Sequence, residues 1–261
     1  MRFSRTKLAA LLCPLLASLL LLLPSVQAAQ TEYRGCRYQK PQDFLIRKNF
    51  MRGSQLDGKK ANQAIRYRVQ RYGRIEGAPY EQLNEKSAYS HAKAVQFLGL
   101  PLLVHEKIAP ALACVERRLK KDCTKSDERY KAHAVGGFRT ENSYRGAEVS
   151  NHLFGIAIDI DPNRNPCCGC VAPWPDHKAC QGPAASVFER TELPRCWIDT
   201  FERYGFYWLG RDPQLRDTMH FEFLGDPERI LPIEPASRLP RASPGVGHRN
   251  RSRSGTTAAR P

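Results

Sequence analysis

Residues 150–159, SNHLFGIAID, place a histidine and an aspartate seven positions apart. After Gly155 the isoleucines alternate with Ala157 and Asp159, which is the period-two pattern of a β-strand. The isoleucines would share one face of this strand, and Asp159 would point from the other. His152 precedes the glycine, in a turn that leads into the strand, and can fold back toward the carboxylate. This stretch therefore predicts half of a metal site.

A second alternating stretch, residues 217–223, reads DTMHFEF. Its apolar residues alternate with His220 and Glu222, so these two polar side chains would leave the same face of a strand. Asp217 would lie in the turn that enters the strand. Glu222 would either orient a neighbouring side chain or form an ordinary surface salt bridge.

If the two strands are neighbours, His152, Asp159 and His220 converge on one point. Two imidazoles and one carboxylate with an open fourth position are typical of catalytic zinc, whereas structural zinc uses four protein ligands. Such a site needs a further carboxylate that takes a proton from water and passes it to a leaving amine, and Asp217 is the candidate. Taken singly, either histidine could be structural and Asp217 could merely cap a turn.

The paired motifs, Ser-x-His-x-x-Gly-x-Ala-x-Asp and Asp-x-x-His-Phe-Glu, resemble those of the VanY-type metallopeptidases. That family comprises zinc D,D-carboxypeptidases and L-alanyl-D-glutamate endopeptidases that act on peptidoglycan. The resemblance covers roughly Lys107 to Pro227 and includes the sequence GGFR at 136–139. It implies a small α+β domain, in which an antiparallel sheet with packed helices surrounds one catalytic Zn²⁺ ion.

The resemblance also implies roles for single residues. The three zinc ligands fall on the residues named above and the general base falls on Asp217, whose Asp form is more typical of the L-alanyl-D-glutamate branch. Arg139 would steady the scissile carbonyl and the oxyanion, and Ser150 would lie near the substrate. From the residues alone, Arg139 could instead pair with Glu141 or Glu148, and Ser150 could be a turn residue.

The N-terminus has the pattern of an export signal. Basic residues are followed by an apolar run and by small residues up to Ala28, so we expect a signal peptide over residues 1–28. A membrane anchor is the alternative, but the apolar run is short for a span of about 20 residues. After cleavage no stretch would anchor the chain in a membrane, and the protein would be periplasmic or secreted.

The chain is basic, with a net charge of +15. Three of these charges lie in residues 1–28 and six arginines lie in the tail from Arg238, which leaves about +6 for the body. A basic exported protein is expected to meet an anionic cell-wall or envelope surface. We find no aromatic motif that would stack on bases and no helix pattern typical of DNA recognition, so we do not expect nucleic acid as a partner. We expect a monomer whose partners are peptidoglycan peptides.

Eight of the nine cysteines follow the expected cleavage site. An even number in an exported chain predicts disulfides, but their pairing cannot be read from the sequence. Cys167, Cys170, His177 and Cys180 form a C-x2-C-x6-H-x2-C pattern. In a reducing compartment this pattern would indicate a zinc knuckle, whereas disulfides are expected here.

Other elements follow from hydrophobic periodicity. A helix should begin after Asp57 and end at Gly73. Its basic residues Arg66, Arg68 and Arg71 are expected to be solvated. The remaining expected elements are strands at about 94–97 and 100–104 that form a hairpin, a helix at 106–121, a strand at 130–138, a helix ending at 205, and strands at 206–209 and 219–224.

These elements suggest one domain with extensions. After the signal peptide, residues 29–104 would form an N-terminal segment packed on the core. The zinc peptidase core would span 105–233, with a cysteine-rich insert at 162–194. Residues 234–261, rich in Pro, Ser, Gly and Arg, would form a disordered basic tail.

The sequence thus favours an exported zinc peptidase acting next to D-amino acids in the cell wall. It does not separate carboxypeptidase from endopeptidase action, because that depends on whether the insert or the N-terminal segment closes the cleft beyond the leaving residue. One alternative is a non-catalytic, zinc-containing module that binds the cell wall. Another is a disulfide-rich adhesion or structural protein in which the metal is incidental.

Overall fold

The structure is a computed structural model that describes residues 32–33, 35–52, 55–123, 130–142 and 148–231. The expected signal peptide and the expected basic tail lie outside the described residues. Within the described ranges, no helix has the length and apolar character needed to cross a membrane.

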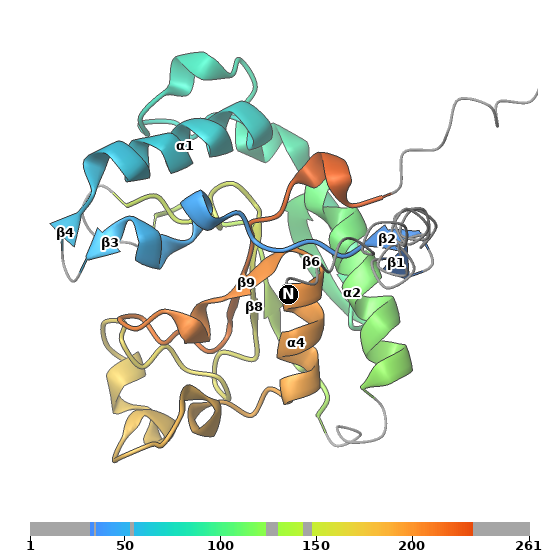
Figure 1. The fold of residues 1–261 in the computed structure, drawn as a ribbon, viewed down its shortest axis with the longest axis vertical. Coiled ribbons are helices and arrows are strands. Elements are labelled where there is room, and N and C mark those ends of the chain that lie inside the picture. Colours follow the sequence, from blue (N-terminus) through green and yellow to red (C-terminus); the bar gives the residue numbers. More distant parts are fainter. Residues whose placement is uncertain (1–31, 34, 53–54, 124–129, 143–147, 232–261) are drawn as a thin grey trace, which may run out of the picture.

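A four-stranded antiparallel sheet forms the centre of the fold (Figure 1). Its order is β7-β8-β10-β9, so β8 and β10 are the two inner strands. They pair with His220 opposite Asp159, as the two sequence stretches predicted. The strands are β7 (Val135–Gly136), β8 (Ala157–Ile160), β10 (His220–Phe223) and β9 (Phe206–Trp208).

Two helices, α2 (Ala109–Asp122) and α4 (Arg195–Arg203), pack against each other, and α4 also packs on β9. The ring of Phe201 on α4 stacks on Phe221 of β10, with centroids 4.2 Å apart. Both rings are buried in the main hydrophobic cluster. The apolar face of the sheet is therefore covered by helices, which leaves the face that carries Asp159 and His220 for the site.

The third helix, α1 (Gly58–Tyr72), lies across the top of the view in Figure 1. Both predicted ends are confirmed: Asp57 caps the first turn by accepting from the Lys60 N–H, and Gly73 follows the last turn with φ 107°. The expectation that Arg68 is solvated is wrong, because this residue is only 4% exposed and donates to the Leu45 carbonyl. Arg68 belongs to the buried side of the helix, next to Val69.

A hairpin of β5 (Ala92–Phe97) and β6 (Leu100–His105) was predicted around Leu98-Gly99 and is present. Both turn residues have positive φ, 56° and 80°, which suits a two-residue hairpin turn. Shorter pairs form at the N-terminal side, where β1 (Glu32–Tyr33) pairs with β2 (Cys36–Arg37) and β3 (Met51–Arg52) with β4 (Gln55–Leu56).

The expected strand at 130–138 is wrong in extent, since only β7 joins the sheet. Before β7, the side chain of Asp161 accepts hydrogen bonds from the backbone N–H groups of His133 and Ala134. These N–H groups therefore have partners without pairing to a neighbouring strand. After β7 the chain crosses toward β6, where the Phe138 N–H donates to the Leu103 carbonyl. A Cβ at Gly137 would overlap that carbonyl, which explains why a glycine stands at the crossing.

Four disulfides join the eight cysteines of the described residues. They link Cys36 to Cys114, Cys123 to Cys196, Cys167 to Cys170, and Cys168 to Cys180. The last two lie within the insert, the gold segment at the lower left of Figure 1. The zinc-knuckle alternative is excluded by this pairing, because its three cysteines are oxidised and His177 lies against the Asn163 carbonyl instead.

Candidate active site

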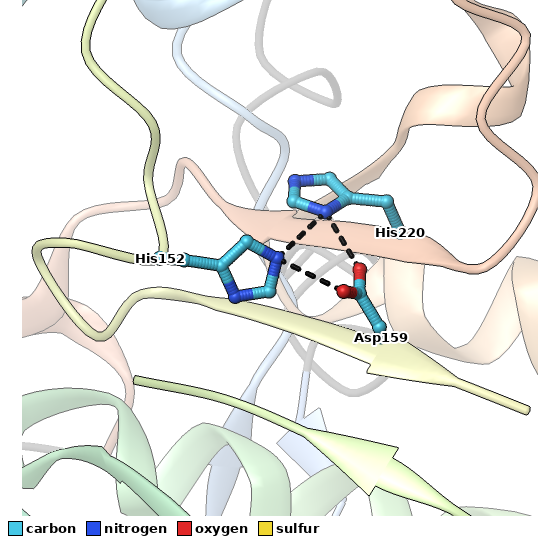
Figure 2. Close-up of side chains that lie close together, drawn as sticks. All are labelled: His152, Asp159 and His220. Carbon is cyan, nitrogen blue, oxygen red and sulfur yellow. Dashed lines mark hydrogen bonds and ion pairs between the residues drawn. The ribbon is translucent and has the colours of Figure 1, made fainter. Parts of the chain in front are cut away.

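His152, Asp159 and His220 come together on the open face of the sheet (Figure 2). Nε2 of His152 lies 3.1 Å from Nδ1 of His220 and 3.2 Å from Oδ2 of Asp159. Nδ1 of His220 lies 2.8 Å from Oδ1 of Asp159. All three side chains are buried. One nitrogen from each ring and the carboxylate therefore face a common point.

The turn before β8 sets the position of His152. Its backbone is closed by hydrogen bonds from the Leu153 N–H to the Ser150 carbonyl and from the Gly155 N–H to the His152 carbonyl. Gly155 has φ 66°, and a Cβ there would overlap the ring of Phe138. The glycine of the motif is therefore required by both backbone conformation and packing.

The outer nitrogens of both rings meet hydrogen-bond acceptors. Nδ1 of His152 lies 2.6 Å from the Gly137 carbonyl, and Nε2 of His220 lies 3.2 Å from Oε1 of Glu222. With a hydrogen on each outer nitrogen, the inner nitrogens can offer lone pairs to a metal ion once His220 has lost the proton that it shares with Asp159. Of the two sequence alternatives for Glu222, the structure supports orientation of a ligand, since the residue is buried beside His220.

The electrostatics of the cluster favour a positive charge between the three side chains. Burial lowers the pKa of His220, but hydrogen bonds to Asp159 and Glu222 outweigh it and raise this pKa to about 10. Burial lowers the pKa of His152. Burial raises the pKa of Asp159, yet the two histidines more than offset this and hold it well below its usual range. Two nitrogens and one carboxylate oxygen fit a zinc ion with an open position.

Asp217 lies in the loop before β10 and its side chain reaches the same cleft. The residue is 8% exposed, and Oδ1 has no hydrogen-bond partner among the described residues. Burial raises the pKa of Asp217 to about 7, and the nearby Asp159 charge acts in the same direction, while His220 and Arg139 oppose it. A buried carboxylate of this kind can accept and release a proton near neutral pH.

Arg139 and Ser150 also line the cleft. The guanidinium of Arg139 forms a close ion pair with the carboxylate of Asp159. Its expected alternative partner Glu148 is instead 2.7 Å from the guanidinium of Arg47. The hydroxyl of Ser150 accepts from the His152 N–H at 3.3 Å, so this serine stabilises the turn and borders the cleft at once.

The cleft has a volume of about 380 Å³, and both segments that the sequence offered as its possible walls contribute to it, although no single residue of either was predicted there. The N-terminal segment contributes Arg47 and Met51. The insert contributes the residues Cys167, Gly169, Cys170, Val171 and Trp174. The available signal for Arg47 was a basic residue inside the apolar run FLIRKNF at 44–50.

Arg47 ties the N-terminal segment to two loops of the cleft. Its Nε pairs with Glu148, and its Nη1 lies 3.2 Å from Asp212 and 3.0 Å from Oε1 of Gln214. Both Arg47 and Asp212 are buried. Because this buried guanidinium forms several ion pairs and hydrogen bonds, it fixes the relative position of the loops that precede Ser150 and Asp217.

The insert is attached to the loop that carries Asp217. The Gly169 N–H donates to the Leu215 carbonyl at 2.7 Å, and the Thr218 N–H donates to the Pro166 carbonyl at 3.1 Å. A Cβ at Gly169 would overlap the carbonyl of Gln214, so the two backbones lie in direct contact. The disulfide between Cys167 and Cys170 closes this turn beside Asp217.

Replacement of Glu222 by glutamine is expected to weaken zinc binding by about 10–100-fold, because the amide orients His220 less strongly than a carboxylate. The dissociation constant is measured by competition with a chromophoric chelator. Glu202→Gln is the matched control, since Glu202 pairs with Arg211 away from the cluster. A folded Glu222→Gln protein that binds zinc as tightly as the wild type contradicts the orienting role.

The fold and this cluster define a candidate metal site of His–Asp–His type on an antiparallel sheet. Residues 144–223 match the family model described as D-alanyl-D-alanine carboxypeptidase, which supports the resemblance to the VanY-type peptidases that the motifs indicated. The match holds the three cluster residues and Asp217, whereas Arg139 precedes it. No curated protein and no solved structure matched the chain.

Proposed function

We propose that this protein is an exported, zinc-dependent peptidase that hydrolyses a peptidoglycan peptide bond next to a D-amino acid. One observation carries the proposal: two imidazole nitrogens and a carboxylate converge beside a second buried carboxylate that stands apart from them. The family match supports a peptidase of the D-alanyl-D-alanine carboxypeptidase kind.

In this proposal His152, Asp159 and His220 hold the zinc ion. When bound, zinc supplies Lewis acidity that polarises a carbonyl and acidifies water. Asp217 takes the proton of the attacking water at its unpartnered Oδ1 and returns it to the nitrogen of the leaving amine. Arg139, at the edge of the cluster, donates to the negative charge that develops on the scissile carbonyl.

Export and residence at the cell wall are supported by two further observations. The four disulfides of the described residues are typical of proteins in oxidising compartments outside the cytosol. The net charge of +15, of which only three charges lie in the expected signal peptide, favours association with anionic wall or envelope polymers. We therefore place the protein in the periplasm or outside the cell.

The bond that is cut can be identified from the products. Purified muropeptides are incubated with the zinc-loaded protein and analysed by mass spectrometry. Loss of one D-alanine identifies a carboxypeptidase, and a cut after L-alanine identifies an endopeptidase. The proposal expects one of these two products, and an unchanged set of muropeptides contradicts it.

A further inference from the structure

A second hollow lies beside the proposed catalytic cleft. Its volume is about 470 Å³, and it shares Arg139 with the cleft as a lining residue. The other residues that line it are Tyr89, Leu103, Phe138, Thr140, Glu141 and Asn142. All of them lie outside residues 144–223, so the family match does not account for this hollow.

An exposed aromatic residue forms one wall. Tyr89 is 56% exposed, and its ring meets Phe138 edge to face with centroids 5.5 Å apart. This packing fixes the tyrosine ring at one side and leaves much of its surface in contact with water. An exposed ring next to a hollow is available to pack on the apolar face of a ligand.

Both rings are held by their surroundings. The Phe138 N–H donates to the Leu103 carbonyl at 2.8 Å, and its ring rests where Gly155 has no Cβ. Tyr89 belongs to the short 3₁₀ helix at 88–91, whose buried Ala88 is hydrogen-bonded to the Arg74 carbonyl. The aromatic wall is therefore preorganised, which lowers the entropy cost of binding a ligand there.

The opposite rim is polar and connected to the cleft. Thr140 and Glu141 offer an exposed hydroxyl and carboxylate. The amide of Asn142 donates to the Glu148 carbonyl at 2.8 Å and accepts from the Ser150 N–H at 3.2 Å. A ligand that settles against this rim would thus lie next to the loop that carries Ser150 into the site.

We propose that this hollow is a subsite for a pyranose ring of the wall glycan, so that the preferred substrate is a wall peptide still attached to its glycan. A pyranose has an apolar C–H face, which suits the ring of Tyr89, and a polar edge, which suits Thr140 and Glu141. The volume of the hollow, about 470 Å³, lies within the range of sites that bind small molecules. This inference rests on the proposed peptidase function and deepens it.

The test compares two substrates, a glycan-linked muropeptide and the same stem peptide without its sugars. The zinc-loaded wild type is expected to show a higher kcat/KM on the glycan-linked substrate. Tyr89→Ala is expected to lower that kcat/KM about tenfold and to leave the sugar-free peptide unchanged. Tyr89→Phe, which keeps the ring, should retain the preference. Tyr80→Ala is the control, since Tyr80 lines a separate hollow beside α1.

Failure of the subsite and failure of the proposed function give different results. Equal rates on both substrates, or an equal loss on both in Tyr89→Ala, overturn the subsite while cleavage itself upholds the peptidase. If the wild type cleaves neither substrate, the peptidase proposal fails, and the subsite is then tested by a binding experiment. In that case a peptide-free oligomer of N-acetylated amino sugars is titrated and followed by NMR. Binding that Tyr89→Ala abolishes supports the subsite, and no binding overturns it.

Discussion

Asp217→Asn is expected to lower kcat by about 10²–10⁴-fold while zinc remains bound, because general acid–base catalysis typically contributes this much. Asparagine has nearly the same shape as aspartate but cannot accept the proton of the attacking water. The three proposed zinc ligands stay intact in this variant. The loss should therefore appear in turnover of a muropeptide, measured beside the zinc content of the same purified sample.

Asp199→Asn is the matched control for this experiment. Asp199 pairs with Arg195 on the exposed side of α4 and does not line the cleft. Its replacement should leave kcat unchanged. If Asp217→Asn keeps a rate within a few fold of the wild type, another group moves the proton and the assignment of Asp217 is wrong. If the wild type binds zinc but turns over no wall peptide, the non-catalytic binding module becomes the better account.

Replacement of a zinc ligand should have the second large effect. His152→Ala is expected to weaken zinc binding by more than the roughly 10–100-fold expected for Glu222→Gln, since it removes a direct ligand. Turnover should fall to background. In the wild type, zinc affinity should rise with pH through the neutral range, because the metal must displace the proton that His220 holds.

Zinc content per chain and zinc affinity at several pH values check this prediction. His177→Ala provides the control, because His177 lies in the insert against the Asn163 carbonyl and outside the cluster. It should bind one zinc ion per chain, like the wild type. Full zinc content in His152→Ala would show that the metal, if bound, lies elsewhere.

The convergence of His152, Asp159 and His220 could be predicted because it depends on local patterns. Two alternating stretches each place polar residues on one strand face, and antiparallel pairing of β8 with β10 sets Asp159 opposite His220. Asp217 follows from its position three residues before His220. The ends of α1 were equally local, since Asp57 and Gly73 act within one turn of the helix.

The insert and the N-terminal segment were expected near the cleft, but the residues that form its walls could not be predicted, because they depend on contacts between distant segments. Arg47 reaches Glu148 and Asp212 across more than a hundred positions. The disulfide pairing also follows from the folded arrangement, as eight cysteines allow about 105 pairings. Arg68 was expected in solvent because it is charged. Its position on α1, next to Val69 on the buried side of the helix, was the better guide.

The N-terminal segment and the insert are far apart in the sequence, and both line the proposed site. Met51 from the first and Trp174 from the second line the same cleft; Met51 precedes residues 144–223, which match the family model, whereas Trp174 lies within them. Since the sheet and the turn before β8 supply the proposed zinc ligands, and these two segments supply walls of the cleft, we expect substrate choice to depend mainly on the two segments.

The most direct test of the central claim measures cleavage of one purified muropeptide by three samples of the protein. The first is loaded with zinc, the second has lost its metal to a chelator, and the third has had its zinc restored. Mass spectrometry should show a cut next to a D-amino acid that disappears with the chelator and returns with zinc. Identical products with and without the metal, or no cut by the zinc-loaded protein, would contradict the account.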